Sequence, residues 1–260
     1  MPAPVSLLLD QMRRLAATER PGKRVRLGDA AMDTALSGGL KLGALHEVYA
    51  ASGGDAAAAS GFALGLAMRA SAGKPLLWAR EDMLDVETGL VYAPGLAAFG
   101  IAPQSVVLVR ARDAENVLKA GEDALRCRGL GAVMIEPWGS PARLGLTASR
   151  RLVLAAAASG VTAVMLRVAG APSPSAAETR WRIAAAPSRR LDADTPGPPA
   201  FDVTLLRRRG GDAGQSWFVE WNRDRLSFVA RGEQSAAPLS RTVVSVPAGG
   251  TAGEILRLTG

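Results

Sequence analysis

Short apolar runs alternate with helical patterns between residues 45 and 167. Five runs rich in Val, Leu and Ile predict strands, at Leu45–Ala50, Pro75–Ala79, Ser105–Val109, Ala132–Glu136 and Val161–Arg167. Helices are predicted between them, over Ala56–Ala72, from an Asp113 N-cap to about Arg128, and over Gly145–Ser159. Because strands that are apolar on both faces belong in parallel sheets covered by helices on two sides, this region predicts a parallel α/β core.

The pattern changes after Ala169. A loop rich in Pro and Ser comes first, followed by predicted strands at Thr179–Ala185, Phe201–Arg209 and Ser216–Trp221. The last two strands flank the Gly-rich segment Gly210–Gly214, which is typical of a hairpin. The expected fold is therefore a parallel central sheet flanked by helices and extended by antiparallel C-terminal strands.

The two ends of the chain differ from this core. Residues 5–18 have apolar side chains at helical spacing and precede Pro21-Gly22, so residues 1–24 are expected to form an amphipathic helix and a linker. One domain is expected over residues 25–230. The composition of residues 231–260 turns to Ser, Ala, Pro and Gly, which predicts a flexible tail.

The amino-acid composition excludes some kinds of site and favours some kinds of partner. The chain of 260 residues has 27 Arg, four Lys, one His (His46) and one Cys (Cys127), which excludes a His-rich or Cys-cluster metal site. The formal charge of +7 and a pI near 10.4 favour contact with nucleic acid or an acidic partner. No apolar stretch reaches the ~20 residues of a membrane span and no secretory signal is evident, so a cytoplasmic location is expected. For His46 a structural role is favoured over that of a general base, and for Cys127 a packing role.

The segment after the first strand is where an α/β protein of this kind would bind phosphate. A P-loop needs Lys followed by Ser or Thr at the head of the helix. This segment holds no Lys, and it carries an acid where a phosphate would lie; its residues are Ala51, Ser52, Gly53, Gly54 and Asp55. Glu81 and Glu136 follow or end strands where ATPases place a water-polarising acid and a Mg²⁺-orienting acid. Without the Lys they are interpreted as vestigial, and no cofactor or catalytic residue is expected.

Basic and aromatic residues suggest a nucleic-acid or partner site. Arg180-Trp181-Arg182 interleaves charge with an aromatic ring, and Arg207-Arg208-Arg209 adjoins the hairpin. Arg and Trp together can neutralise phosphates and stack on bases. The alternative is a basic strand whose alternate residues face water, with Trp181 in the core.

Several segments carry a resemblance to a known family. They are HEVYA followed by GDAAAASGFALGLA, then PLLWARED, VMIEPWG, and ETRWRIAAAPS with the strand ending WFVEWN. Over roughly residues 25–225 the chain resembles the ImuA-type damage-inducible mutagenesis proteins of bacteria. These proteins are RecA-like and distantly related to the cell-division inhibitor SulA.

The resemblance implies a RecA-type domain that acts as a non-catalytic adaptor in SOS-induced translesion synthesis. The implied partners are RecA, an ImuB-like inactive Y-family polymerase homologue and, indirectly, an error-prone replicative-type polymerase subunit; direct contact with DNA is left open. Two alternatives remain at this point. One is a DNA-dependent ATPase with an unconventional site, motivated by Glu81 and Glu136. The other is a SulA-like division inhibitor, which the additional C-terminal strands disfavour.

Overall fold

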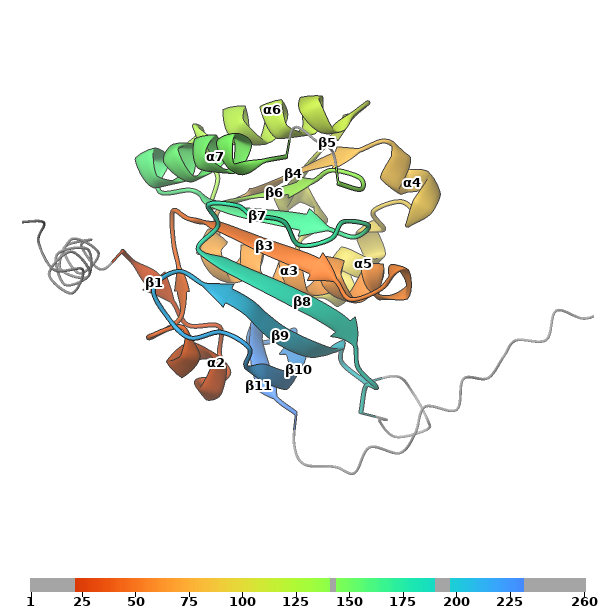
Figure 1. Cartoon of the computed structure of the whole chain (residues 1–260). Coiled ribbons are helices and arrows are strands. Elements are labelled where there is room, and N and C mark those ends of the chain that lie inside the picture. Colours follow the sequence, from red (N-terminus) through yellow and green to blue (C-terminus); the bar gives the residue numbers. More distant parts are fainter. Residues whose placement is uncertain (1–21, 141–143, 190–196, 232–260) are drawn as a thin grey trace, which may run out of the picture.

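A nine-stranded sheet forms the centre of the protein. The structure, a computed structural model, describes residues 22–140, 144–189 and 197–231. In the described part the strand order is β11-β10-β9-β8-β3-β7-β6-β4-β5 (Figure 1). The strands span Leu45–Ala50 (β3), Leu76–Glu81 (β4), Val106–Ala111 (β5), Ala132–Glu136 (β6), Thr162–Arg167 (β7), Thr179–Ala185 (β8), Ala200–Arg208 (β9), Ser216–Asn222 (β10) and Ser227–Ala230 (β11).

Strands β8, β3, β7, β6, β4 and β5 are mutually parallel, whereas β9, β10 and β11 continue the sheet by antiparallel pairing. The predicted parallel core with antiparallel C-terminal strands is thus confirmed. β3 is the middle strand of the nine-stranded sheet, and it pairs in parallel with β7 on one side and with β8 on the other.

Helices cover both faces of the parallel part. Helix α3 (Ala56–Ser71) packs on one face, and α6 (Ala114–Leu125) and α7 (Leu146–Ser159) lie on the other (Figure 1). Two short helices, α4 (Met83–Glu87) and α5 (Ala93–Ala98), and 3₁₀ turns at Gly53–Asp55 and Pro103–Ser105 complete the connections. Near the amino end, β1 (Arg24–Val25) pairs with β2 (Leu40–Lys41) around α2 (Ala30–Ala35), which Asp29 caps through the Met32 amide.

The core beneath α3 is aromatic. Phe62 on α3 lies within 6.0 Å, centroid to centroid, of Trp181, Phe201 and Phe228. Gly65 on the same helix leaves room for these rings, because a Cβ there would lie 2.5 Å from Phe228 Cζ. Gly65 therefore allows α3 to pack closely on the sheet.

Several features depart from the prediction. The helices α4 and α5 and the strand β11 were not predicted, and β5 is an edge strand rather than a strand buried on both faces. The predicted N-terminal helix and most of the C-terminal tail lie outside the described residues, so those two predictions remain untested. No helix in the described part of the chain is both long and apolar enough to cross a membrane.

Candidate functional site

The loop between β3 and α3 is held to the end of β8. Asp55 Oδ1 accepts a hydrogen bond from the Ala185 amide at 2.8 Å, and Asp55 Oδ2 accepts one from Ser52 Oγ at 2.5 Å. The Ala51 amide donates to the Ile183 carbonyl at 2.8 Å. At the amino end of α3, the carboxylate of Asp55 thus accepts hydrogen bonds from the protein's own Ala185 amide and Ser52 hydroxyl.

This loop differs in its backbone conformation from the anion cradle of a P-loop. Anion cradles in P-loops use successive amides in alternating right- and left-handed conformations. None of residues 51–55 has a positive φ; the loop makes a 3₁₀ turn at Gly53–Asp55 and enters the helix at Ala56. The negative charge of Asp55 at the helix N-terminus also disfavours a second anion there.

Glu136, at the end of β6, is buried and forms an ion pair with Arg80. Its side chain is 1% exposed, and Oε2 accepts hydrogen bonds from Trp78 Nε1 at 2.8 Å and from Arg80 Nε at 3.0 Å. Arg80 comes from the neighbouring strand β4, where it pairs directly with Glu136. Within the described residues, Glu136 Oε1 has no hydrogen-bond partner.

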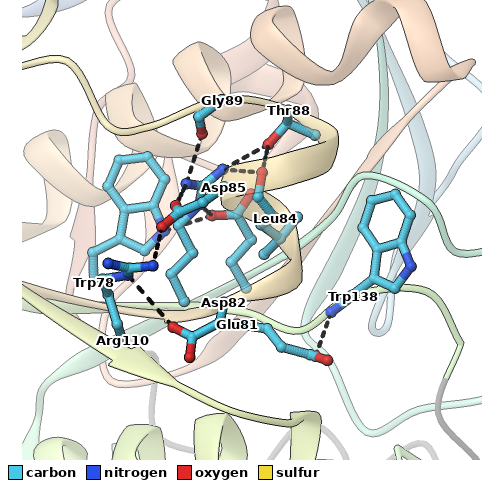
Figure 2. A network of polar contacts seen from close by, with 11 residues as sticks. Trp78, Glu81, Asp82, Leu84, Asp85, Thr88, Gly89, Arg110 and Trp138 are labelled. Atoms are coloured by element: carbon cyan, nitrogen blue, oxygen red, sulfur yellow. Dashed lines mark hydrogen bonds and ion pairs between the residues drawn. The ribbon is translucent and has the colours of Figure 1, made fainter.

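Arg80 uses all five of its N–H donors. Beyond Glu136, it donates to the Asp85 carboxylate, the Gly89 and Leu84 carbonyls and the Thr88 hydroxyl, at 2.6 to 3.3 Å. Figure 2 shows these acceptors arranged around α4 and the turn after it, with Arg110 reaching Asp82 and Asp85 from the next strand. Arg80 therefore ties α4 to the sheet as well as neutralising Glu136.

Burial and the neighbouring positive charge shift the pKa of the Glu136 carboxyl in opposite directions. Burial raises its pKa to about 7, although the Arg80 charge and the two hydrogen bonds act in the opposite direction. A carboxyl that is partly protonated at neutral pH and already paired with a guanidinium is a poor site for Mg²⁺, because the fixed cation repels a second one. Arg80 was missed from the sequence; the signal was a lone Arg inside the apolar strand LLWARE.

Glu81 has a backbone partner. At the end of β4 its Oε2 accepts a hydrogen bond from the Trp138 amide at 2.8 Å (Figure 2). The carboxylate thereby fixes the loop that follows β6. The structure thus places Glu81, Glu136 and the 51–55 loop at the carboxyl ends of parallel strands, but each acid is bound to protein donors.

The basic and aromatic residues on β8 do not form the expected stacking surface. Trp181 is 0% exposed, and its Nε1 donates to Thr179 Oγ1 at 2.7 Å, so its ring is unavailable to a base. Arg180 pairs with buried Glu47 at 2.9 Å, and its guanidinium lies over the Tyr49 ring. Arg182 is exposed. Trp181 thus lies in the core and Arg182 faces water, as the alternative interpretation predicted, whereas Arg180 is largely buried against Glu47.

The second basic group is also bound to the protein. Arg207 donates to the Ser175 carbonyl at 2.7 Å, and Arg208 donates to the Ala35 carbonyl and to Ser37 Oγ. Arg209 is exposed beside the hairpin, and its amide donates to the Glu178 carbonyl. Arg207 and Arg208 therefore join β9 to neighbouring segments, and exposed positive charge in the two groups is concentrated at Arg182 and Arg209.

His46 has a structural environment, in line with the favoured interpretation. It is 0% exposed, with Nδ1 2.7 Å from Thr179 Oγ1 and Nε2 2.8 Å from the Lys41 carbonyl. A neutral ring that donates from Nε2 and accepts at Nδ1 satisfies both contacts. Burial lowers its pKa from 6.5 to about 4. Cys127, for which packing was predicted, is instead exposed.

This environment predicts a pH-dependent stability. Because the folded pKa of His46 lies below its unfolded value, its contribution is complete above pH 6.5 and is lost as the pH falls towards 4, amounting to about 3 kcal/mol. Glu136 acts in the opposite sense, because its raised pKa costs stability as the pH rises from 4.5 to 7. Urea unfolding of the parent and of His46→Gln at pH 4.5 to 7.5 isolates the histidine. A difference between the two proteins that does not change with pH would contradict the assignment.

No group of three or more potential metal ligands occurs in the described residues.

The sheet order, the helices on both faces and the strand-end acids define a RecA-like α/β protein. The crystal structure of the RadB recombinase superposes with a TM-score of 0.53 at 14% sequence identity, covering 80% of this chain and 99% of RadB. No model of a known protein family matches the chain. It is 35% identical over 225 residues to Protein ImuA of Caulobacter vibrioides, in strains NA1000 and CB 15, covering 79% of this chain and 86% of the relative. The chain belongs to the ImuA family.

Proposed function

We propose that this chain is a non-catalytic RecA-like adaptor in SOS-induced translesion synthesis, acting in the cytoplasm through residues 25–230. ImuA-family membership supports a role in damage-induced mutagenesis. The observation that favours a non-catalytic role is the pairing of Glu136 with Arg80 rather than with an open Mg²⁺ position. The closed loop at Asp55 points the same way.

Nucleotide binding offers the direct test. MgATP, with or without single-stranded DNA, is expected to shift the thermal midpoint by less than about 1 °C, because a ligand stabilises a folded protein only if it binds that state. Bacterial RecA under the same conditions is the positive control. ATP turnover by the purified chain that disappears in a Glu81→Gln variant would favour the unconventional ATPase instead.

The proposed partners are RecA and an ImuB-like inactive Y-family polymerase homologue. The error-prone replicative-type polymerase subunit joins indirectly. This part of the proposal rests on the family and on the basic charge of the chain, +7, which suits acidic protein surfaces as well as DNA.

Co-purification tests the partners. Tagged chain is expected to retain both RecA and the ImuB-like protein from the same bacterium after nuclease treatment. An Arg182→Glu variant tests whether the exposed basic residue on β8 contributes to partner binding. Arg150→Glu, at an exposed position on α7, is the matched control. Recovery of neither protein would remove the adaptor role, and loss of binding on nuclease treatment would make DNA the bridge.

A further inference from the structure

A groove with apolar walls runs between α6 and α7. It consists of two adjoining hollows of about 500 and 370 Å³, which share Glu122, Arg126 and Arg151. Glu122 pairs with Arg126 at 2.9 Å and with Arg151 at 2.5 Å, so much of the charge in the middle of the groove is already compensated. The apolar lining comes from both helices and consists of Leu118, Leu152, Leu154, Ala155 and Ala158.

The outward face of α7 is apolar for a helix at the protein surface. Residues 152–159 read LVLAAAAS and include no charged side chain. Leu154 is 69% exposed, and Leu146, about two turns earlier, is 41% exposed. A surface helix normally turns charged residues outward, and a helix that is apolar on all sides is normally buried. Nothing in the described part of the chain covers this face of α7.

A segment before the described residues has the pattern that would cover it. Residues 5–18 read VSLLLDQMRRLAAT, with Leu8, Met12 and Leu15 on one face of the predicted helix. The three charged residues of this segment fall on the opposite face. The segment has 14 residues, the same number as α7, which corresponds to about 21 Å of helix.

The described chain begins close to the carboxyl end of α7. The Lys23 carbonyl accepts a hydrogen bond from the Leu42 amide at 2.8 Å. A Cβ on the next residue, Gly43, would lie 3.3 Å from the Cα of Gly160, which caps α7. These contacts place Lys23 within about 15 Å of Gly160, and the chain from residue 18 to residue 23 can span up to about 17 Å. A helix over residues 5–18 can therefore enter the groove at this end.

We propose that residues 5–18 form a helix that docks in the groove between α6 and α7 of the same chain. Its carboxyl end lies beside the carboxyl end of α7, so the two helices run parallel. Its apolar face covers Leu154 and the small side chains next to it, and its charged face takes their place at the surface. The inference concerns packing within the chain and does not depend on the role proposed above.

The C-terminal segment is less well placed to fill the groove. The described residues end at Arg231, directly after β11. β11 is an edge strand, four strands away from β3, which α7 contacts. At about 4.8 Å per strand this separation is roughly 19 Å. Residues 232–260 are also rich in Ser, Ala, Pro and Gly, whereas residues 5–18 carry apolar side chains at helical spacing.

Disulfide trapping in the full chain tests the docking. In a Cys127→Ser background, Leu154→Cys is combined with Met12→Cys or Leu15→Cys, on the apolar face of the segment. The matched control combines it with Asp10→Cys, on the charged face. Because a disulfide requires Cα atoms about 4.4–6.8 Å apart, the faster of the two apolar-face pairs is expected to link within one chain at least about fivefold faster than the control. Non-reducing electrophoresis of samples taken during mild oxidation measures these rates.

Trypsin cleavage after Arg13 and Arg14 provides an independent measurement. Leu154→Lys is expected to speed this cleavage at least about tenfold, because proteolysis follows the population of the undocked segment. Val86→Lys, which places the same charge at an apolar side chain 81% exposed on α4, is expected to leave the rate unchanged. Thermal unfolding confirms that both variants fold.

Three outcomes would overturn the proposal. They are equal linking rates for the two faces of the segment, links that form only between two chains, and equal cleavage of the parent and the Leu154→Lys variant. Links between chains would assign the groove to a second copy of the protein instead.

Discussion

Replacing Arg80 with Met is expected to lower the free energy of unfolding by about 3–5 kcal/mol, because removing one partner of a buried ion pair leaves the other charge uncompensated. The substitution keeps an unbranched apolar stem, but it removes the hydrogen bond to Glu136 and the four hydrogen bonds that Arg80 donates to α4 and the following turn. The loss is expected to be larger at pH 8 than at pH 5. At the lower pH the carboxyl of Glu136 is protonated, since its pKa is raised to about 7.

Urea unfolding of the parent and variant at both pH values measures this effect. The double variant Arg80→Met/Glu136→Leu is expected to recover part of the lost stability, because it removes the orphaned carboxylate together with its partner. A single variant within about 1 kcal/mol of the parent at pH 8 would show that the pair does not stabilise the fold.

Replacing Trp181 with Ala is expected to cost about 3–5 kcal/mol, the usual range for a fully buried aromatic side chain. The indole is 0% exposed, packs against Phe62 and Trp217, and donates to Thr179 Oγ1, which also contacts His46. The change would therefore open a cavity under α3 and remove a donor from a buried polar group.

The neighbouring positions provide the controls. Arg182→Ala, on the exposed side of the same strand, is expected to change stability by less than about 0.5 kcal/mol. Trp181→Phe is expected to fall between the two, since it keeps an aromatic ring but loses the hydrogen bond. Denaturant unfolding distinguishes the three variants, and an Ala variant as stable as the parent would refute a core role for Trp181.

Much of the fold could be predicted from hydrophobic periodicity. The apolar runs at β3, β6 and β7 are buried along their length, and Asp113 caps α6 as expected. Periodicity predicted β5 as a strand but did not predict its place at the edge of the sheet, because an apolar run does not specify how many neighbouring strands flank it. It also missed α4, which has five residues and is tied to the sheet through the long-range hydrogen bonds of Arg80.

The candidate site was predicted by position but not by environment. Glu81 and Glu136 lie at strand ends, as the sequence indicated. Sequence spacing could not show that Arg80 on β4 would face Glu136 on the adjacent strand β6. Nor could it show that Asp55 would accept a hydrogen bond from the Ala185 amide, 130 residues away. Both contacts depend on the strand order, which the pattern of elements does not specify.

The place of β3 in the sheet has a consequence for synthesis. Its two neighbours, β7 and β8, begin at Thr162 and Thr179, more than 110 residues later in the chain. At a translation rate of about 5–20 residues per second, β3 waits roughly 6–25 s on the ribosome for its first lasting partner. During that time β3 lacks both of its strand partners, and Phe62 on α3 lacks the rings of Trp181, Phe201 and Phe228. The nascent chain therefore carries an unpaired apolar strand, the kind of surface that promotes aggregation, until residues near 185 emerge.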